Sequence, residues 1–427
     1  MKMMSMKNKL PPGWIECELK EIFNTSSGGT PKRGNPVYYG GDIPWLKSGE
    51  LNDGIVSSVE EYITDEGLNN SSAKLFPRGS LLIALYGATV GKLGILDFDS
   101  ATNQAICCIY QNDNYCRDFL FYYLFFKKDY LINQGRGGTQ PNISQGIIKT
   151  LIIPVPPLNE QKRIVEKIEK VFRKIDEGTK NLIIAKEQIK KYCQSVLKAA
   201  FEGVFYKTTE WKNKKLEQIT KRIVGGGTPP KSISRYYEGT IPFMTVKDMI
   251  SLHPSDTEWH ITQEAVDNSS TNLIEKDTII IATRVGLGKI VRVNFDTTIN
   301  QDLKALILND LVDKDFCEYL LKYKTPEIIS KGRGTTVKGI TLEELRNIKV
   351  DLPSIDEQKQ IVKEIEKRFK ISDEVENVIL ENLIKVEQLK QSILKKAFEG
   401  RLVPQDPTDE PASALLEKIK KRKQQNA

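Results

Sequence analysis

One internal repeat constrains this chain of 427 residues more than any other feature. Residues 159–172 read NEQKRIVEKIEKVF and residues 356–369 read DEQKQIVKEIEKRF, with nine of fourteen positions identical at a separation of 197. At the same separation, QSVLKAAFEG at 194–203 matches QSILKKAFEG at 391–400 at eight of ten positions. The period excludes a solenoid, whose units run about 20–50 residues. It indicates a duplicated unit, made of one globular domain followed by one long helix.

The rest of the chain repeats more weakly at separations of 197 or 198. The recurring marks are Trp14/Trp211, Gly-Thr-Pro at 29–31/227–229, Tyr38-Tyr39/Tyr236-Tyr237, Ile43-Pro44-Trp45/Ile241-Pro242-Phe243, Gly91-Lys92/Gly288-Lys289, Asn103-Gln104/Asn300-Gln301 and Arg136-Gly137/Arg333-Gly334. Between these marks the two copies differ widely. Two similar helices suit two copies of one partner, whereas two diverged globular surfaces suit two different ligands, or two halves of one ligand.

The repeated segments predict two long helices, at 159–203 and 356–400. Asn159 and Asp356 are the expected N-caps, and Gly203 and Gly400 are the expected C-terminal stops. Each helix carries a heptad seam, made of Ile164, Ile168, Val171, Ile175, Leu182, Ala185, Ile189, Tyr192 and Val196 in the first and Ile361, Ile365, Val375, Ile379, Val386, Leu389 and Ile393 in the second. Because such a seam needs a facing helix, we predict that the two copies pack as an antiparallel coiled coil.

The globular blocks, at 1–158 and 204–355, have a mixed pattern. Short apolar and β-branched runs predict strands at Leu81–Leu85, Ile106–Tyr110, Leu151–Val155, Thr278–Ala282, Lys304–Leu308 and Ile348–Leu352. Helices are expected at Phe119–Ile132 and Phe316–Ile329. The predicted fold class is therefore mixed α/β, with two small domains joined by two long antiparallel helices. Residues 401–427 are expected to form a basic tail with a short helix at Ala412–Lys423.

Composition narrows the function classes. Lys and Arg number 63 against 56 Asp and Glu, and both globular blocks are nearly neutral, so bulk charge alone does not explain nucleic-acid binding. The six cysteines lack metal-site spacing and indicate reduced thiols in a cytoplasmic protein. Only His253 and His260 are present, which argues against histidine catalysis and against a zinc site. No apolar run approaches the roughly 20 residues of a membrane span.

Two glycine-rich motifs come close to nucleotide sites. GATVGK at 87–92 has three residues between its glycines where a phosphate-binding loop needs four, and Leu93 replaces the magnesium-binding hydroxyl. We interpret it as a turn between strands. GGGTPPK at 225–231 lacks the spacing of a dinucleotide site. The sequence therefore predicts no catalytic residue, no metal and no cofactor in this chain.

Polar loops with cations recur in both copies and are the candidates for DNA contacts, because Lys and Arg reach phosphates or base edges. The candidates are Thr30, Lys32, Arg33, Lys47, Ser48 and Arg136 in the first block and Thr228, Lys231, Thr245, Lys247, Arg284 and Arg333 in the second. Taken singly, each fits an ordinary solvated loop residue better; as sets that recur in both copies they gain weight. Asn103-Gln104 and Asn300-Gln301 are interpreted as structural, through side-chain hydrogen bonds to the backbone.

The order of these segments resembles that of the specificity subunit of type I restriction-modification systems. The tail GRLVPQDPTDEPASALLEKI at 400–419 is similar to that family's ending. GWIECELKEI at 13–22 and SGGTPKRGNPVYYGGDIPWLKSGEL at 27–51 are similar to the openings of its target-recognition domains. The second copy departs from the first, because Glu210 replaces Gly13 before the tryptophan and Phe243 replaces Trp45.

The resemblance implies a non-catalytic subunit whose two domains each recognise one half of a bipartite site in double-stranded DNA. The helices would set the spacer between the half-sites and dock two modification (methyltransferase) subunits. Those partners would carry S-adenosylmethionine, and restriction subunits that use ATP and magnesium would join them. Two other classes stay open. A coiled-coil protein-interaction adaptor without DNA specificity predicts no sequence-selective binding, and an enzyme acting alone predicts a nucleotide or metal motif.

Overall fold

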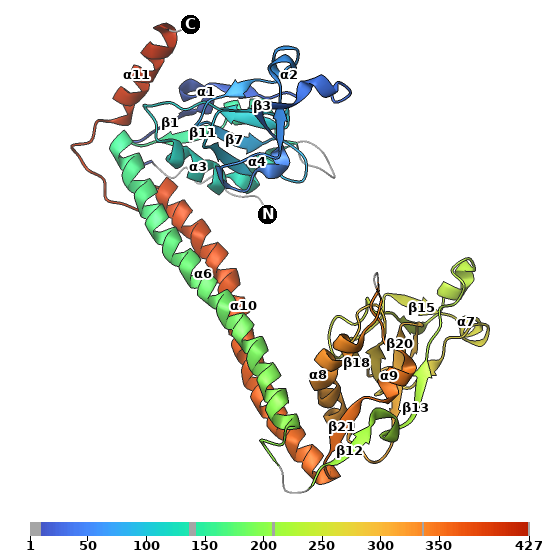
Figure 1. Ribbon diagram of the computed structural model, residues 1–427. Helices are drawn as coiled ribbons and strands as arrows, with labels where there is room; N and C mark the ends of the chain where they lie inside the picture. The colour runs from blue at the N-terminus through green and yellow to red at the C-terminus, as the bar shows by residue number, and fades with distance from the viewer. Residues whose placement is uncertain (1–9, 136–141, 207–209, 335–336, 426–427) are drawn as a thin grey trace. The chain divides into compact units, whose positions relative to one another are not determined.

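The computed structural model describes residues 10–135, 142–206, 210–334 and 337–425 (Figure 1). These residues form two compact units. Unit 1 combines Met1–Asn181 with Asn382–Ala427, and unit 2 is Leu182–Glu381. Each unit therefore contains one globular domain together with half of each long helix. The predicted fold class, two mixed α/β domains with a pair of long helices, is confirmed.

The N-terminal domain, in unit 1, is built on three sheets. Their strand orders are β2-β10-β7-β8-β4, β5-β3-β9-β6 and β1-β11. The strands are β1 Ile15–Glu18, β2 Thr25–Ser27, β3 Tyr39–Leu46, β4 Gly54–Val56, β5 Glu61–Ile63, β6 Leu75–Phe76, β7 Leu81–Ala84, β8 Leu93–Leu96, β9 Ser100–Thr102, β10 Ile106–Ile109 and β11 Ile152–Val155. The helical segments are α1 Leu19–Ile22, η1 Pro36–Tyr38, η2 Ser48–Glu50, α2 Asp65–Asn69, α3 Arg117–Phe126, α4 Lys128–Gln134 and α5 Gln145–Lys149.

The C-terminal domain, in unit 2, repeats this plan with strand orders β13-β20-β17-β18, β15-β14-β19-β16 and β12-β21. Its strands are β12 Lys212–Lys215, β13 Thr220–Gly225, β14 Ile241–Met244, β15 Trp259–Ile261, β16 Leu273–Ile274, β17 Ile279–Ala282, β18 Ile290–Arg292, β19 Thr297–Ile299, β20 Leu303–Leu308 and β21 Lys349–Leu352. Its helical segments are η3 Leu216–Gln218, η4 Ser234–Tyr237, α7 Gln263–Asp267, α8 Lys314–Lys331 and α9 Leu342–Arg346. Each described strand of the C-terminal domain corresponds to one strand of the N-terminal domain. Strand β4 of the N-terminal domain has no counterpart among the described strands of the C-terminal domain. The predicted helix at Phe119–Ile132 is divided into α3 and α4 at Lys127.

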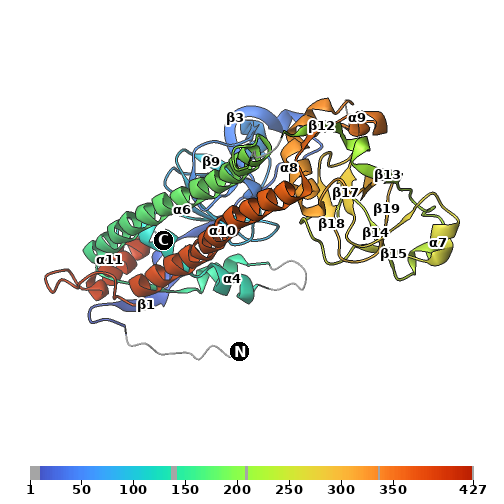
Figure 2. The ribbon, with the colours of Figure 1, turned by 90° about the horizontal axis from the view of Figure 1, so that it is seen from below.

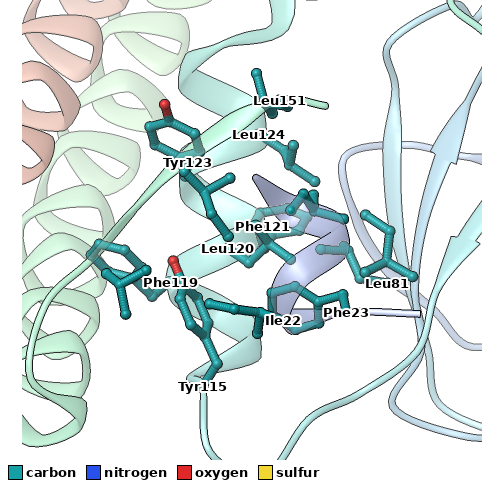
Figure 3. Packing of buried hydrophobic residues seen from close by; sticks show 14 of the residues in the cluster. Ile22, Phe23, Leu81, Tyr115, Phe119, Leu120, Phe121, Tyr123, Leu124 and Leu151 are labelled. Carbon is teal, nitrogen blue, oxygen red and sulfur yellow. The ribbon is translucent and has the colours of Figure 1, made fainter. Parts of the chain in front are cut away.

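The central strand of each domain is buried on both faces, which explains its unbroken apolar sequence. In β7, Leu81 and Ile83 point into one apolar cluster, whereas Leu82 and Ala84 point into another. Figure 3 shows Leu81 in the first cluster, packed with aromatic residues of α3. In β17, Ile279 and Ile281 alternate in the same way with Ile280 and Ala282. GATVGK connects β7 to β8 by a short turn, as predicted.

The two long helices are α6 Leu158–Phe201 and α10 Ile355–Phe398. Their predicted N-caps were wrong: each helix starts earlier, and in α10 the Ser354 hydroxyl accepts the hydrogen bond from the Glu357 amide at 3.4 Å. The predicted C-terminal stops are confirmed. Gly203 and Gly400 have φ of 77° and 66°, the left-handed conformation that glycine adopts without strain, and each terminates its helix.

Within each unit, half of α6 lies beside half of α10 (Figure 1, Figure 2). In unit 1, Lys390 pairs with Asp176 at 2.6 Å. In unit 2, Lys186 of α6 pairs with Glu376 of α10 at 3.4 Å. Tyr192, later in α6, bonds Arg368, which comes earlier in α10 than Glu376, so the two helices run antiparallel. Among the seam residues, Ile164, Ile168, Val196, Ile361, Ile365, Ile379 and Ile393 are buried, and Ile175, Leu182, Ile189 and Val386 are half-buried. The seam prediction was wrong for Val375 and Leu389, which are exposed. Tyr192 is also exposed, but its side chain bonds Arg368 of the facing helix.

The C-terminal tail packs into unit 1. Its helix α11 spans Ala412–Gln425, slightly longer than predicted. Leu415 and Ile419 are buried in the apolar cluster that also holds Trp14. Arg163 of α6 donates to both carboxylate oxygens of the buried Asp409, at 2.7 and 3.4 Å. The tail is therefore part of the core of the unit that contains the N-terminal domain.

Candidate nucleic-acid interface

The Gly-Thr-Pro loop of each domain is held close to the sheet that contains β9 or β19. A β-carbon at Gly28 would collide with Thr102, and one at Gly226 would collide with the backbone of Ile299, so both positions require glycine. The Thr30 hydroxyl then donates to the Gln104 amide oxygen. Its counterpart Thr228 donates to Gln301 at 2.5 Å. The two glutamines are thus structural, although they bond to side chains; Asn300, which accepts from the Asp302 amide at 3.2 Å, fits the predicted backbone role.

Each loop is also tied to an aromatic side chain. The Tyr39 hydroxyl donates to the Pro31 carbonyl at 2.6 Å, and the Tyr237 hydroxyl donates to the Pro229 carbonyl at the same distance. Trp45 donates from its ring nitrogen to the Gly29 carbonyl at 3.0 Å. The Trp45 bond has no counterpart, since Phe243 stands at the equivalent position, but the threonine and tyrosine bonds recur, so the recurring residues of the sequence build one scaffold twice.

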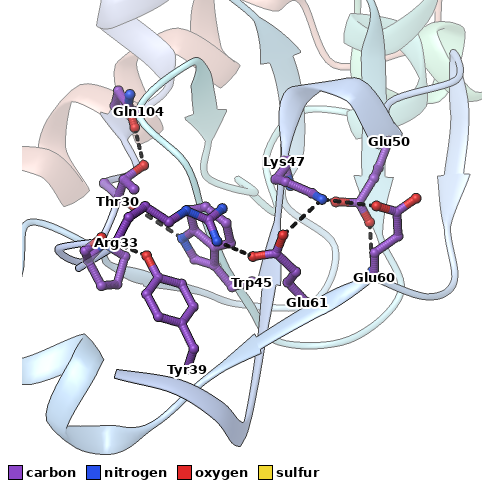
Figure 4. Close-up of polar contacts among 11 residues, drawn as sticks. Thr30, Arg33, Tyr39, Trp45, Lys47, Glu50, Glu60, Glu61 and Gln104 are labelled. Carbon is purple, nitrogen blue, oxygen red and sulfur yellow. Dashed lines mark hydrogen bonds and ion pairs between the residues drawn. The ribbon is translucent and has the colours of Figure 1, made fainter. Parts of the chain in front are cut away.

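Arg33 lies on this scaffold in the N-terminal domain (Figure 4). Its guanidinium carbon is 4.8 Å from the Tyr39 ring centroid and 4.9 Å from the Trp45 ring centroid. Its Nη1 donates to a Glu61 oxygen at 2.7 Å. This bond holds the pKa of Glu61 below its ordinary value and that of Arg33 above it. The cation is therefore positioned by three side chains.

Lys47 joins the same cluster. Its ammonium pairs with Glu60 at 2.9 Å and with Glu61 at 3.1 Å, and these bonds raise the pKa of Lys47. Glu50 links the end of β3 to the start of β5, because its carboxylate accepts from the Lys47 amide at 2.8 Å and from the Glu60 amide at 2.9 Å. Two cations are thus opposed by three carboxylates, so this part of the surface is not basic.

The C-terminal domain has a carboxylate equivalent to Glu50, but its described residues do not form the ionic cluster of Arg33, Lys47 and Glu61. Asp248 accepts from the Thr245 amide and from the Glu258 amide, both at 2.7 Å, as Glu50 does in the first domain. Trp259 stands opposite Phe243 in the strand register, where Glu61 stands opposite Trp45. Lys231 takes the place of Arg33, with its ammonium 5.9 Å from the Trp259 ring centroid. The same scaffold therefore presents an ionic cluster in one domain and an aromatic one in the other.

The remaining candidates occupy neighbouring loops. Ser48 begins η2, and its carbonyl accepts from the Thr89 hydroxyl at 2.9 Å. Lys32 and Lys247 are exposed and form no ion pair with any residue that the structure describes. Arg284 and Arg333 each lie beside Gly339, and they pair with Asp302 at 3.5 Å and with Glu344 at 3.3 Å, respectively. Arg136 lies outside the described residues.

Sequence reasoning missed Glu61 and Trp259, the residues that most distinguish the two clusters. No motif marks either one, since both lie in short strands outside the recurring tripeptides. Their equivalence was available as a separation of 198, the same as that of the Gly-Thr-Pro loops, but a Glu-to-Trp difference carries no similarity signal.

The structure offers no metal centre in the part of the chain that it describes, where no three His, Cys, Asp or Glu side chains are grouped to hold an ion. No helix among the described residues is both long enough and apolar enough to cross a membrane.

Comparison with known proteins identifies this architecture. Residues 11–185 and 208–385 each match the family model of the type I restriction modification DNA specificity domain. The specificity subunit of the type I restriction enzyme MjaIX from Methanocaldococcus jannaschii is 27% identical over 371 residues, which cover 81% of this chain and 84% of that protein. The EcoKI specificity subunit from Escherichia coli K12 is 24% identical over 454 residues, covering 96% of both chains.

A solved structure agrees in fold. A chain from a study of complex assembly and conformational transition of the type I R-M system superposes with a TM-score of 0.73 at 24% identity, covering 92% of this chain and all of that one. The two family matches each take in one globular domain and more than half of the helix that follows it. The chain therefore belongs to the family of type I restriction-modification DNA specificity domains, as a specificity subunit with two copies of that domain.

Proposed function

We propose that this chain gives a type I restriction-modification complex its DNA specificity, with each globular domain recognising one half of a bipartite target. The observation that carries this proposal is the pair of matched scaffolds with different side chains at one place, Glu61 with Arg33 in one domain and Trp259 with Lys231 in the other. One scaffold used twice with different surface chemistry suits two different half-sites of one ligand. Two different protein ligands would also suit that difference, but the match of both domains to the DNA specificity family supports DNA as the ligand over the adaptor alternative.

The DNA contacts are proposed for the loops around these clusters. Thr30, Lys32, Arg33, Lys47 and Ser48 surround the first scaffold, and Thr228, Lys231, Thr245 and Lys247 surround the second. Arg284 and Arg333 both lie beside Gly339 in unit 2 and are proposed as a second pair of contacts there. Because both domains are nearly neutral overall and Arg33 and Lys47 are paired with carboxylates, the exposed Lys32 and Lys247, with partner subunits supplying further positive charge, would provide the electrostatic attraction.

The chain is proposed to be non-catalytic and to dock two methyltransferase subunits on its helices. The helices expose large apolar side chains, and exposed apolar patches mark protein-binding surfaces. They are Ile183, Ile184, Tyr192, Ile371, Val375, Val378 and Leu380 in unit 2 and Ile384 and Leu389 in unit 1. The methyltransferase subunits would supply S-adenosylmethionine, and restriction subunits would supply the ATP- and magnesium-dependent step. A DNA target and six free cysteines favour a cytoplasmic complex.

The experiment is co-expression of the full chain with the methyltransferase subunit of its system, followed by mapping of methylated positions in the host DNA. The expected result is a split motif, made of two short half-sites separated by a gap of fixed length. A stable complex that methylates no defined sequence would contradict the proposal and favour a protein-interaction adaptor.

A further inference from the structure

The position of Arg33 leaves a defined part of its guanidinium for a ligand. One face of the group is covered by the Tyr39 and Trp45 rings, and Nη1 is bonded to Glu61. Within the described residues, Nη2 and Nε form no hydrogen bond, and 53% of the side chain is exposed. A planar donor group is thus held by Glu61 and two aromatic rings (Figure 4), and two of its nitrogens remain available to a ligand.

The charges around Arg33 argue against a phosphate as that ligand. Arg33 and Lys47 are opposed by Glu50, Glu60 and Glu61, all joined to the cluster by hydrogen bonds. A phosphate site needs excess positive charge, because its affinity comes largely from neutralising the DNA backbone. The bonded cluster, with two cations and three carboxylates, has a formal charge of −1 and does not supply that; Lys32, next to Arg33 and unpaired with any described residue, is a better phosphate contact. Directional hydrogen bonds to a neutral base edge do not depend on an excess of positive charge.

Guanine is the base edge that fits a fixed guanidinium. In the major groove it presents two acceptors, O6 and N7, which the parallel donors of an arginine match in a bidentate pair. The order imposed by Glu61 and the two rings also lowers the entropy lost on binding, because the side chain has fewer conformations to give up.

The C-terminal domain indicates that this position carries specificity rather than stability. Its scaffold keeps the tyrosine-to-proline-carbonyl bond and the carboxylate link through Asp248. What changes is the group at the surface: Lys231 replaces Arg33, and Trp259, 42% exposed, replaces Glu61. Side chains that differ on a retained scaffold are those expected to distinguish two half-sites.

We propose that Arg33 reads a guanine in the half-site of the N-terminal domain, and that Glu61 is the positioning residue that orients it. This inference rests on the proposed function, since it assigns one base contact within the DNA site. Glu61 acts through Arg33 and has no contact with DNA in this arrangement. Lys47 keeps Glu61 from turning away, because it bonds the second Glu61 oxygen.

The test uses the full chain in complex with its methyltransferase subunits, and a library of DNA duplexes randomised at each position of the half-site. Arg33→Ala should reduce the preference for guanine at one position by roughly 5- to 150-fold, the range for a lost bidentate contact. Arg33→Lys, which retains the charge and loses the planar fork, should also lose most of that preference. Arg78→Ala is the matched control, because Arg78 is an exposed arginine of the same domain. It pairs with Asp97 at 2.7 Å and, in the part of the chain that is described, has no bond to the cluster around Arg33.

Glu61→Gln separates positioning from structure. It should lower the guanine preference while binding to unrelated DNA strengthens and its salt dependence becomes steeper, since a negative charge beside two cations is removed. A purely structural role would instead lower the thermal midpoint and leave the base preference unchanged.

Two results would overturn the assignment. If Arg33→Ala weakened binding to every duplex equally, Arg33 would be a phosphate contact. If the wild-type complex methylated a split motif and Arg33→Ala kept the same motif, the guanine contact would be wrong and the proposed function would stand. A wild-type complex with no split motif would instead overturn the proposed function itself.

Discussion

Replacing Ile419 with alanine tests whether the C-terminal tail belongs to the core of unit 1. Ile419 lies on α11, is 1% exposed and packs in the cluster that contains Trp14 and Phe119. An Ile→Ala change in a core costs about 2–5 kcal/mol, from lost burial and from the cavity left behind. For a unit of 150–250 residues, each kcal/mol lowers the midpoint by about 2–4 °C. The expected decrease in the unfolding midpoint of unit 1 is therefore about 4–20 °C.

Differential scanning calorimetry of the full chain measures this change. The matched control is Ile384→Ala, because Ile384 belongs to unit 1 but is 64% exposed, and its truncation should shift the midpoint by less than about 2 °C. The transition of unit 2 should stay unchanged in both variants. Equal midpoints for Ile419→Ala and the wild type would refute the reasoning, since the tail would then contribute no burial to the unit.

Three further predictions concern the seam, the thiols and acid stability. The double variant Ile168→Asp/Ile365→Asp should abolish folding or assembly with partner subunits, because both residues are fully buried; a wild-type elution profile on size-exclusion chromatography with the methyltransferase would contradict this. In native protein a thiol reagent should label at most Cys116 and Cys193, since the other four cysteines are buried. Burial also raises the pKa of Cys107, Cys108 and Cys317 to about 12. Labelling of all six thiols before denaturation would contradict this prediction. The Arg33 hydrogen bond lowers the pKa of Glu61. The small contribution of this bond to the free energy of unfolding is therefore complete above the unfolded pKa near 4.5 and is lost as the pH falls through the folded pKa. Glu61→Gln should reduce the loss of stability in acid, and an unchanged dependence of stability on pH would disprove the pairing.

The sequence predicted the elements whose signal is local. The duplication, the two long helices and the turn at GATVGK depend on repetition, periodicity and glycine spacing, and each is present in the structure. The helix starts were misplaced because Asn159 and Asp356 have good capping side chains but lie inside helices that begin earlier. Ser354, which does cap α10, is an equally good capping residue two positions before Asp356.

Features that depend on distant contacts were not predictable. No pattern in the sequence of α11 predicts that Leu415 and Ile419 join the same apolar cluster as Trp14, about 400 positions earlier. The loop cations recur as sets in the sequence, but no sequence pattern names their partner: strand pairing brings Glu61 opposite Trp45 and so pairs Arg33 and Lys47 with one carboxylate. Pairing of this kind follows from the register of β3 with β5, which no single-residue pattern encodes.

The central claim is that each domain reads its own half of the DNA target, and a domain exchange tests it most directly. Residues 14–150 would be replaced by the corresponding domain of a relative with a different target, and the methylated sequence would be mapped in cells that also make the methyltransferase subunit. The account predicts that one half-site changes to that of the donor, while the other half-site stays the same. A change in both half-sites, or in neither, would contradict it.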